Sequence, residues 1–128
     1  MQLEVGEEAT PFEHVPYDVN LQRCQRYCEV YDAESSLCTA LAWSTANTSG
    51  VMMFRQRKRD IPSVIPSSTT AFKATNGGGA TLASVNVGTF NKRLDSMELQ
   101  VSIASGLTVG QATLLRAGAG TLLISAEL

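Results

Sequence analysis

Four basic side chains stand close together in the chain: Arg55, Arg57, Lys58 and Arg59. Alternate side chains of a β-strand share a face, so on a strand the three arginines would form a positive stripe, with Lys58 facing the other way. Such a run is typical of a solvated face or of ion pairs between chains. The acids that would pair with it are Asp60, Asp95 and Glu98. Guanidinium groups also bind carboxylates and phosphates, which makes Arg55, Arg57 and Arg59 candidates for contact with anionic surface glycans or phosphate-bearing envelope polymers.

A nucleic-acid partner is not expected for this basic run. The chain carries 10 Lys+Arg against 12 Asp+Glu, a net charge of −2, and only 6% of its residues are aromatic. Proteins that bind nucleic acid combine a basic surface with aromatic rings on which bases stack, and here the rings lie elsewhere in the chain.

The aromatic residues are instead candidates for sugar binding, because a ring can pack on the apolar face of a pyranose. Trp43 and Tyr31 are the candidate ligands of this kind. A tryptophan on an alternating strand is more often a core residue, so for Trp43 both interpretations stay open.

The sequence predicts no catalytic residues. His14 is the only histidine, and no G-x-S-x-G motif accompanies the serines, so His14 is interpreted as a polar loop residue. Glycoside hydrolysis needs two carboxylates set apart in space, which a linear sequence does not exclude. An enzyme that acts on envelope polysaccharide therefore remains an alternative.

No metal or other cofactor is predicted either. Cys24 and Cys28 have the spacing of two ligands on a helix, but a zinc site needs four donors, and only Cys38 and His14 remain. The same spacing does not suit a disulfide, so we expect reduced thiols, with Cys24 packed in the core from the buried face of a helix.

The elements that must position these residues are mostly short strands. Asp18 is the predicted N-cap of one short helix, followed by a strand within 27–31. Residues 37–43 and 51–57 are predicted to form a hairpin around the ANTSG turn, and 69–75 and 81–90 a second one. Further strands are predicted at 97–103, 112–115 and 121–126; in 97–103, Met97, Leu99, Val101 and Ile103 share one face.

Seven or eight short strands without intervening helices predict an all-β fold, an antiparallel β-sandwich (jelly-roll-like) with one short N-terminal helix. The length of 128 residues fits a single domain. Exposed strand edges at low charge also favour a partner subunit. No apolar stretch approaches 18 residues, so membrane insertion is not expected.

Two segments of the chain resemble the C-terminal domain of tailed-phage tail fibres and related virion appendages. The first contains QLEVG (2–6), ATPFEH (9–14) and CQRY (24–27); the second is ASGLTVGQATLLRAGAGTLLISAEL (104–128). A weaker match lies in 53–64, at Arg59, Pro62 and Val64. Since QLEVG commonly ends a preceding domain in that family, the resemblance divides the chain into an N-terminal strand and linker (1–16) and a C-terminal β-sandwich domain (17–128).

The resemblance implies a non-enzymatic virion protein, made in the host cytoplasm, that attaches to host cell-surface glycans as a homotrimer alongside other virion proteins. The alternative is a structural module, such as a capsid or tail decoration or a fibre-tip trimerisation domain without receptor binding. That alternative predicts the RQRKRD face (55–60) buried between chains.

Overall fold

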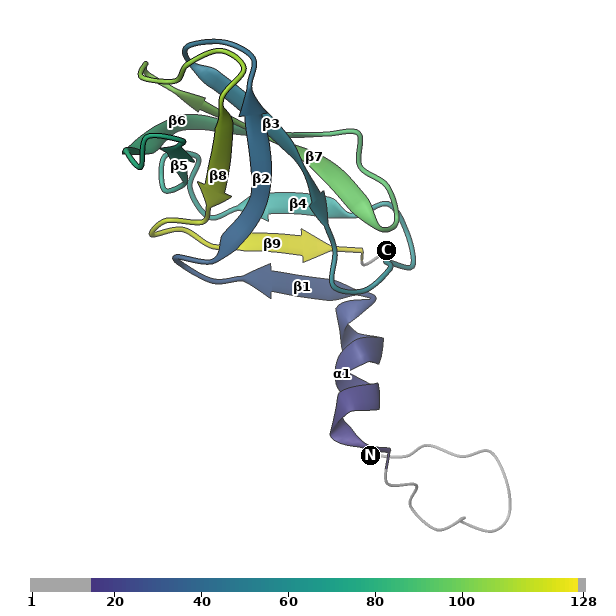
Figure 1. Cartoon of the computed structure of the whole chain (residues 1–128). Helices are drawn as coiled ribbons and strands as arrows, with labels where there is room; N and C mark the ends of the chain where they lie inside the picture. Colours follow the sequence, from purple (N-terminus) through teal and green to yellow (C-terminus); the bar gives the residue numbers. More distant parts are fainter. Residues whose placement is uncertain (1–14, 127–128) are drawn as a thin grey trace, which may run out of the picture.

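The computed structural model describes residues 15–126 (Figure 1). Within this range the chain forms helix α1 (Tyr17–Gln25) and nine strands. The strands are β1 (Cys28–Tyr31), β2 (Ser36–Ala42), β3 (Asn47–Met53), β4 (Ser63–Pro66), β5 (Lys73–Asn76), β6 (Thr81–Phe90), β7 (Ser96–Ile103), β8 (Ala112–Arg116) and β9 (Leu122–Ser125). The predicted all-β class with one short helix is confirmed for these residues, whereas residues 1–14 of the predicted N-terminal strand and linker lie outside them.

The predicted sandwich of two open sheets is not what the structure shows. Six strands close into an antiparallel barrel in the order β2-β3-β7-β6-β5-β8, and the other three form a separate sheet, β1-β9-β4. The ring closes because β8 pairs on both sides, with Leu115 opposite Cys38 of β2 and opposite Ala74 of β5. Closure removes the free edges of these six strands, so of the described strands only β1 and β4 are sheet edges.

A glycine lets two barrel strands approach closely. A side chain at Gly50 of β3 would place its Cβ against the Thr39 carbonyl oxygen of β2, closer than Cβ atoms approach other atoms in proteins. Any larger residue here would push the two strands apart.

Strand β7 supplies the clearest part of the core. Met97, Leu99, Val101 and Ile103 are all buried, as their alternation predicts. Full burial of an aliphatic side chain of this size contributes about 1.5–3 kcal/mol.

The three-stranded sheet lies beneath the barrel, and its inner face belongs to the same core (Figure 1). Tyr31 of β1 and Leu122 and Ile124 of β9 are buried there. On the outer face, Val30 lies opposite Leu123, and Leu123 opposite Ile65. In this row Val30 is 45% and Ile65 54% exposed. Apolar surface therefore faces outward across all three strands.

Helix α1 stands away from the barrel (Figure 1), and none of its residues is buried. It begins after Pro16, its N-cap residue, and no side chain caps it. The predicted cap by Asp18 is therefore wrong; Asp18 lies in the first turn. Cys24 is exposed, so its predicted core position is also wrong, because this helix has no buried face. No described helix is long and apolar enough to cross a membrane.

Both predicted hairpins are present, but the first is shifted. The β2–β3 pairing aligns Leu41 with Ser49, and β3 occupies 47–53 instead of 51–57. The ANTSG residues therefore fall mostly within β3, and the connection from β2 is made by the residues just before them. The second hairpin aligns Lys73 of β5 with Ala83 of β6.

Candidate functional site

The basic run lies in the connection between β3 and β4, residues 54–62, which we call the basic loop. Strand β3 ends where its pairing with β7 ends, at Met53 opposite Ser96, and the chain then crosses to the three-stranded sheet. The predicted stripe of three arginines on a strand is thus wrong. The positions of these side chains are set by loop contacts instead.

One basic side chain of the loop is turned inward. Lys58 is fully buried and forms an ion pair with Glu29 of β1, with 2.8 Å between Nζ and Oε1. Its Nζ also donates to the carbonyl oxygen of Gln25, in the last turn of α1, at 2.5 Å. A cation is favourable at this end of a helix, where backbone carbonyls have no helical partners.

Glu29 holds the basic loop from the other side. Its carboxylate accepts hydrogen bonds from the backbone N–H of Arg55 (3.2 Å) and of Gln56 (2.9 Å), and from the Tyr31 hydroxyl (3.1 Å). Burial alone would raise the pKa of Glu29, but the hydrogen bonds from Lys58, Gln56 and Arg55 together hold that pKa below its ordinary value. The carboxylate is therefore ionised and fully hydrogen-bonded at neutral pH.

Two arginines of the basic loop lie over tyrosine rings. The Arg55 guanidinium carbon is 4.7 Å from the ring centroid of Tyr31, and that of Arg59 is 5.2 Å from the ring centroid of Tyr27. These are cation–π distances. Tyr31 is only 7% exposed, so its ring is not open to a sugar and its role here is to support Arg55. Burial also raises the pKa of its hydroxyl to about 12.

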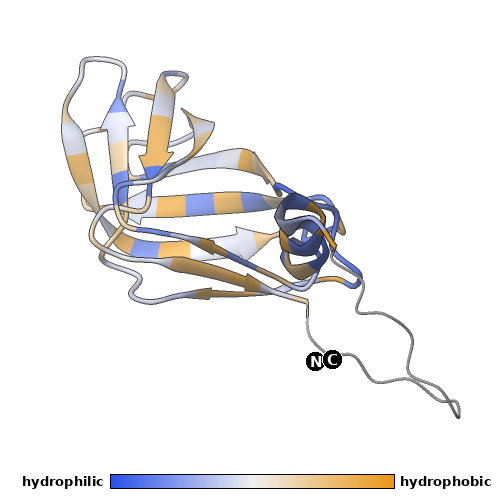
Figure 2. Ribbon diagram, turned by 90° about the horizontal axis from the view of Figure 1, so that it is seen from below, coloured by the Kyte–Doolittle hydropathy of each residue, from blue (hydrophilic) through white to orange (hydrophobic). Residues whose placement is uncertain are grey.

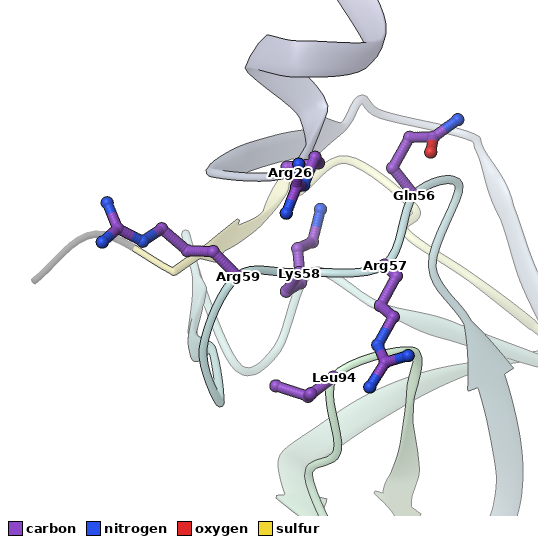
Figure 3. A pocket seen from close by; sticks show the side chains of 6 residues that line it. All are labelled: Arg26, Gln56, Arg57, Lys58, Arg59 and Leu94. Carbon is purple, nitrogen blue, oxygen red and sulfur yellow. The ribbon is translucent and has the colours of Figure 1, made fainter.

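Beside the loop lies a pocket of about 390 Å³, which we call the arginine pocket. Its lining residues are Arg26, Gln56, Arg57, Lys58, Arg59 and Leu94 (Figure 3). They come from the end of α1, the basic loop and the connection before β7. Among residues 15–126 no carboxylate lines the pocket. Sequence reasoning missed Arg26, Gln56 and Leu94 because nothing in the sequence shows which residues pack beside the basic run.

The acids named as ion-pair partners of the basic run make local contacts within the chain. Asp60 accepts the backbone N–H of Ile61 at 2.7 Å, Asp95 accepts the Ser96 hydroxyl at 3.0 Å, and Glu98 accepts the Asn91 side-chain amide at 2.8 Å. Among residues 15–126 the arginines of the pocket form no ion pair with them.

Trp43 is far from the basic loop. It follows β2, and its backbone N–H bonds to the carbonyl of Asn47 at the start of β3, whereas the basic loop follows the end of that seven-residue strand. The two places are thus separated by about 20 Å, the length of the strand. Trp43 is 54% exposed, so the core interpretation is wrong and its ring is open to solvent. Of the residues predicted to bind a ligand, the structure therefore brings Arg55 and Tyr31 into contact, whereas Trp43 lies at the other end of β3.

The described cysteines are free, and among residues 15–126 no three His, Cys, Asp or Glu side chains gather as metal ligands. Burial raises the pKa of the Cys38 thiol to about 11, which makes it a poor nucleophile. His14 lies outside the described residues.

Comparison with protein-family models, with curated proteins and with solved structures finds no match. The resemblance to tail-fibre domains therefore stays a prediction. In the hydropathy-coloured ribbon, hydrophilic residues are concentrated in α1 and in the segments that overlap it in that view (Figure 2).

Proposed function

We propose that this chain is a non-enzymatic attachment domain of a tailed-phage tail fibre or related virion appendage, and that it binds glycans on the host cell surface. The observation that carries the proposal is the way the basic loop is held. The buried Glu29–Lys58 pair fixes its backbone, while Arg55 and Arg59 stay exposed and Arg57 lines the pocket. Fixed backbone under accessible cationic side chains is typical of a binding surface, because little ordering is needed when a ligand arrives.

We also propose that the domain is a homotrimer, with α1 as part of the contact between chains. Helices of nine residues are unstable alone in water, and α1 has no buried face to stabilise it. Tyr17 and Leu21, four residues apart on one side of the helix, are 80% and 41% exposed. The same side of α1 in neighbouring chains would cover these two side chains. Three copies bound at once would also give a higher overall affinity for glycans than one weak site alone.

The structural module without receptor binding is the second candidate. The outward apolar row formed by Val30, Leu123 and Ile65 favours it, because such surface is typical of contacts with other virion proteins. In that case the basic loop would be covered by a neighbouring chain and would not meet a glycan.

The test is adsorption of the labelled domain to a panel of bacterial strains, before and after periodate oxidation of surface sugars. We expect saturable, periodate-sensitive adsorption that is reduced in Arg55→Ala/Arg57→Ala. Sedimentation of the same preparation measures the oligomeric state, and release of reducing ends from the adsorbed polysaccharide would reveal an enzyme. A folded trimer that adsorbs to no strain at high concentration would favour the structural module.

A further inference from the structure

The arginine pocket carries an excess of positive charge that no ion pair among the described residues balances. Lys58 is compensated by Glu29, so the uncompensated charges in the lining are those of Arg26, Arg57 and Arg59. Among residues 15–126 none of these guanidinium groups forms an ion pair, and no carboxylate lines the pocket. An anion bound in the pocket would be attracted by these uncompensated charges.

We propose that the arginine pocket binds the acidic group, a carboxylate or a phosphate, of a surface glycan. This inference rests on the proposed function and specifies its ligand as an acidic polysaccharide. A guanidinium offers two parallel N–H donors that match the two oxygens of a carboxylate or phosphate. Arg59 lies with its guanidinium over the ring of Tyr27, a contact that holds the side chain in place and uses none of its N–H donors in an ion pair.

The backbone around the pocket is fixed on three sides. The N–H of Lys58 donates to the carbonyl of Leu94 at 2.6 Å, and the N–H of Arg59 donates to the carbonyl of Arg26 at 3.2 Å. The N–H of Gln56 donates to Glu29. These bonds tie the end of α1, the basic loop and the connection before β7 together, so the pocket keeps its shape without a ligand.

The size and the remaining lining suit one sugar residue. A volume of about 390 Å³ is at the lower end of small-ligand pockets, which run from about 300 Å³. The side-chain amide of Gln56 can bond to a hydroxyl, and Leu94 offers an apolar surface to a sugar ring (Figure 3). In that view Arg57 extends from the basic loop toward Leu94 and Arg59 extends away from it, so the two guanidinium groups present their N–H donors on different sides of the loop.

The experiment measures binding of the intact chain to oligogalacturonate and to poly(glycerol phosphate), with methyl-esterified oligogalacturonate as the uncharged match. Variants Arg26→Gln and Arg57→Gln each remove one pocket charge. Arg23→Gln removes the same charge from α1 at a position that does not line the pocket. We expect at least one acidic polymer to bind, the methyl ester not to bind, and each pocket variant to lose about tenfold in affinity while Arg23→Gln changes little.

The two acidic polymers distinguish a carboxylate ligand from a phosphate ligand. Failure of both to bind, equal binding of the methyl ester, or an equal loss in Arg23→Gln would overturn the inference. So would tighter binding of a thymidine oligonucleotide, which would favour a nucleic-acid partner. Thermal unfolding of each variant checks that it is folded. If periodate-sensitive adsorption to cells persists undiminished in Arg26→Gln/Arg57→Gln, the pocket is excluded and the attachment function stands.

Discussion

The chain contains two Lys–Glu pairs of almost equal length in opposite surroundings. Lys58–Glu29 measures 2.8 Å, and its side chains are 0% and 1% exposed. Lys73–Glu34 measures 2.7 Å, and its side chains are 38% and 59% exposed. The first joins β1 and the end of α1 to the basic loop; the second joins β5 to the turn after β1.

The comparison teaches that distance says little about what an ion pair does. Water and salt screen the exposed pair, so its attraction is largely offset by the order imposed on two long side chains. The buried pair is not screened, and each charge would be costly without the other. Only the buried pair can therefore hold a loop in place, and its lysine lines the arginine pocket.

The largest expected effect is that of removing one buried charge. Lys58→Met leaves Glu29 buried without its cation and should lower the free energy of unfolding by about 3–5 kcal/mol. Adding Glu29→Gln, which is neutral and still accepts a hydrogen bond from the basic loop through its amide oxygen, should restore much of that loss. Urea unfolding of both single variants and of the double variant gives the coupling free energy between Lys58 and Glu29.

If Lys58→Met and the double variant were equally destabilised, the loss would come from packing of the lysine stem instead of from the unpaired charge. Binding by the arginine pocket should fall with Lys58→Met as well, because the loop that carries Arg57 is then no longer fixed.

The sequence predicts the barrel strands better than the junction at the basic loop, and the reason is the range of the interactions. In β7 the alternation of Met97 to Ile103 is local and reports directly which face is buried. Closure of the barrel is not local, because it depends on β8 pairing with both β2 and β5. The same order of strands along the chain is compatible with a jelly-roll sandwich and with this barrel, so the sequence pattern does not distinguish the two.

The conformation of the basic loop is not predicted from the sequence either, because it too depends on contacts between distant segments. Met52 and Phe54 are both buried, so the alternation of buried and exposed residues continues past Met53, where β3 ends. This alternation therefore predicts a longer strand than the structure contains. The pairing of Lys58 with Glu29 joins segments far apart in the chain, so no spacing reveals it. The signal that the sequence does contain is a single acid, Glu29, in a short strand, and a single lysine among arginines.

The next expected effect is on acid stability. The pKa of Glu29 in the folded chain lies below its ordinary value of 4.5, so the stabilisation it supplies is complete above pH 4.5 and is lost as pH falls through the folded pKa. The loss should be smaller than in Lys58→Met, because the protonated acid still accepts hydrogen bonds. Thermal unfolding from pH 7 to pH 3 measures it, and Glu29→Gln should flatten the curve in that window.

The pKa of Glu34 is also lowered, by the hydrogen bond and the charge of Lys73, so its contribution would be lost in the same acid direction. The Glu29→Gln variant separates the two, because any acid dependence that it retains arises from Glu34 and other groups. An unchanged curve in Glu29→Gln would mean that Glu29 is not the group whose ionisation matters.

The smallest expected effect is that of breaking the exposed pair. Lys73→Met should change the midpoint of urea unfolding by no more than the error of the measurement, since Glu34 stays in water when its partner is lost. Added sodium chloride should remove whatever difference remains, whereas the loss in Lys58→Met should persist at high salt because the buried pair is not screened. A loss in Lys73→Met comparable with that in Lys58→Met would show that the turn after β1 is held as firmly as the basic loop, and the contrast between the two pairs would then fail.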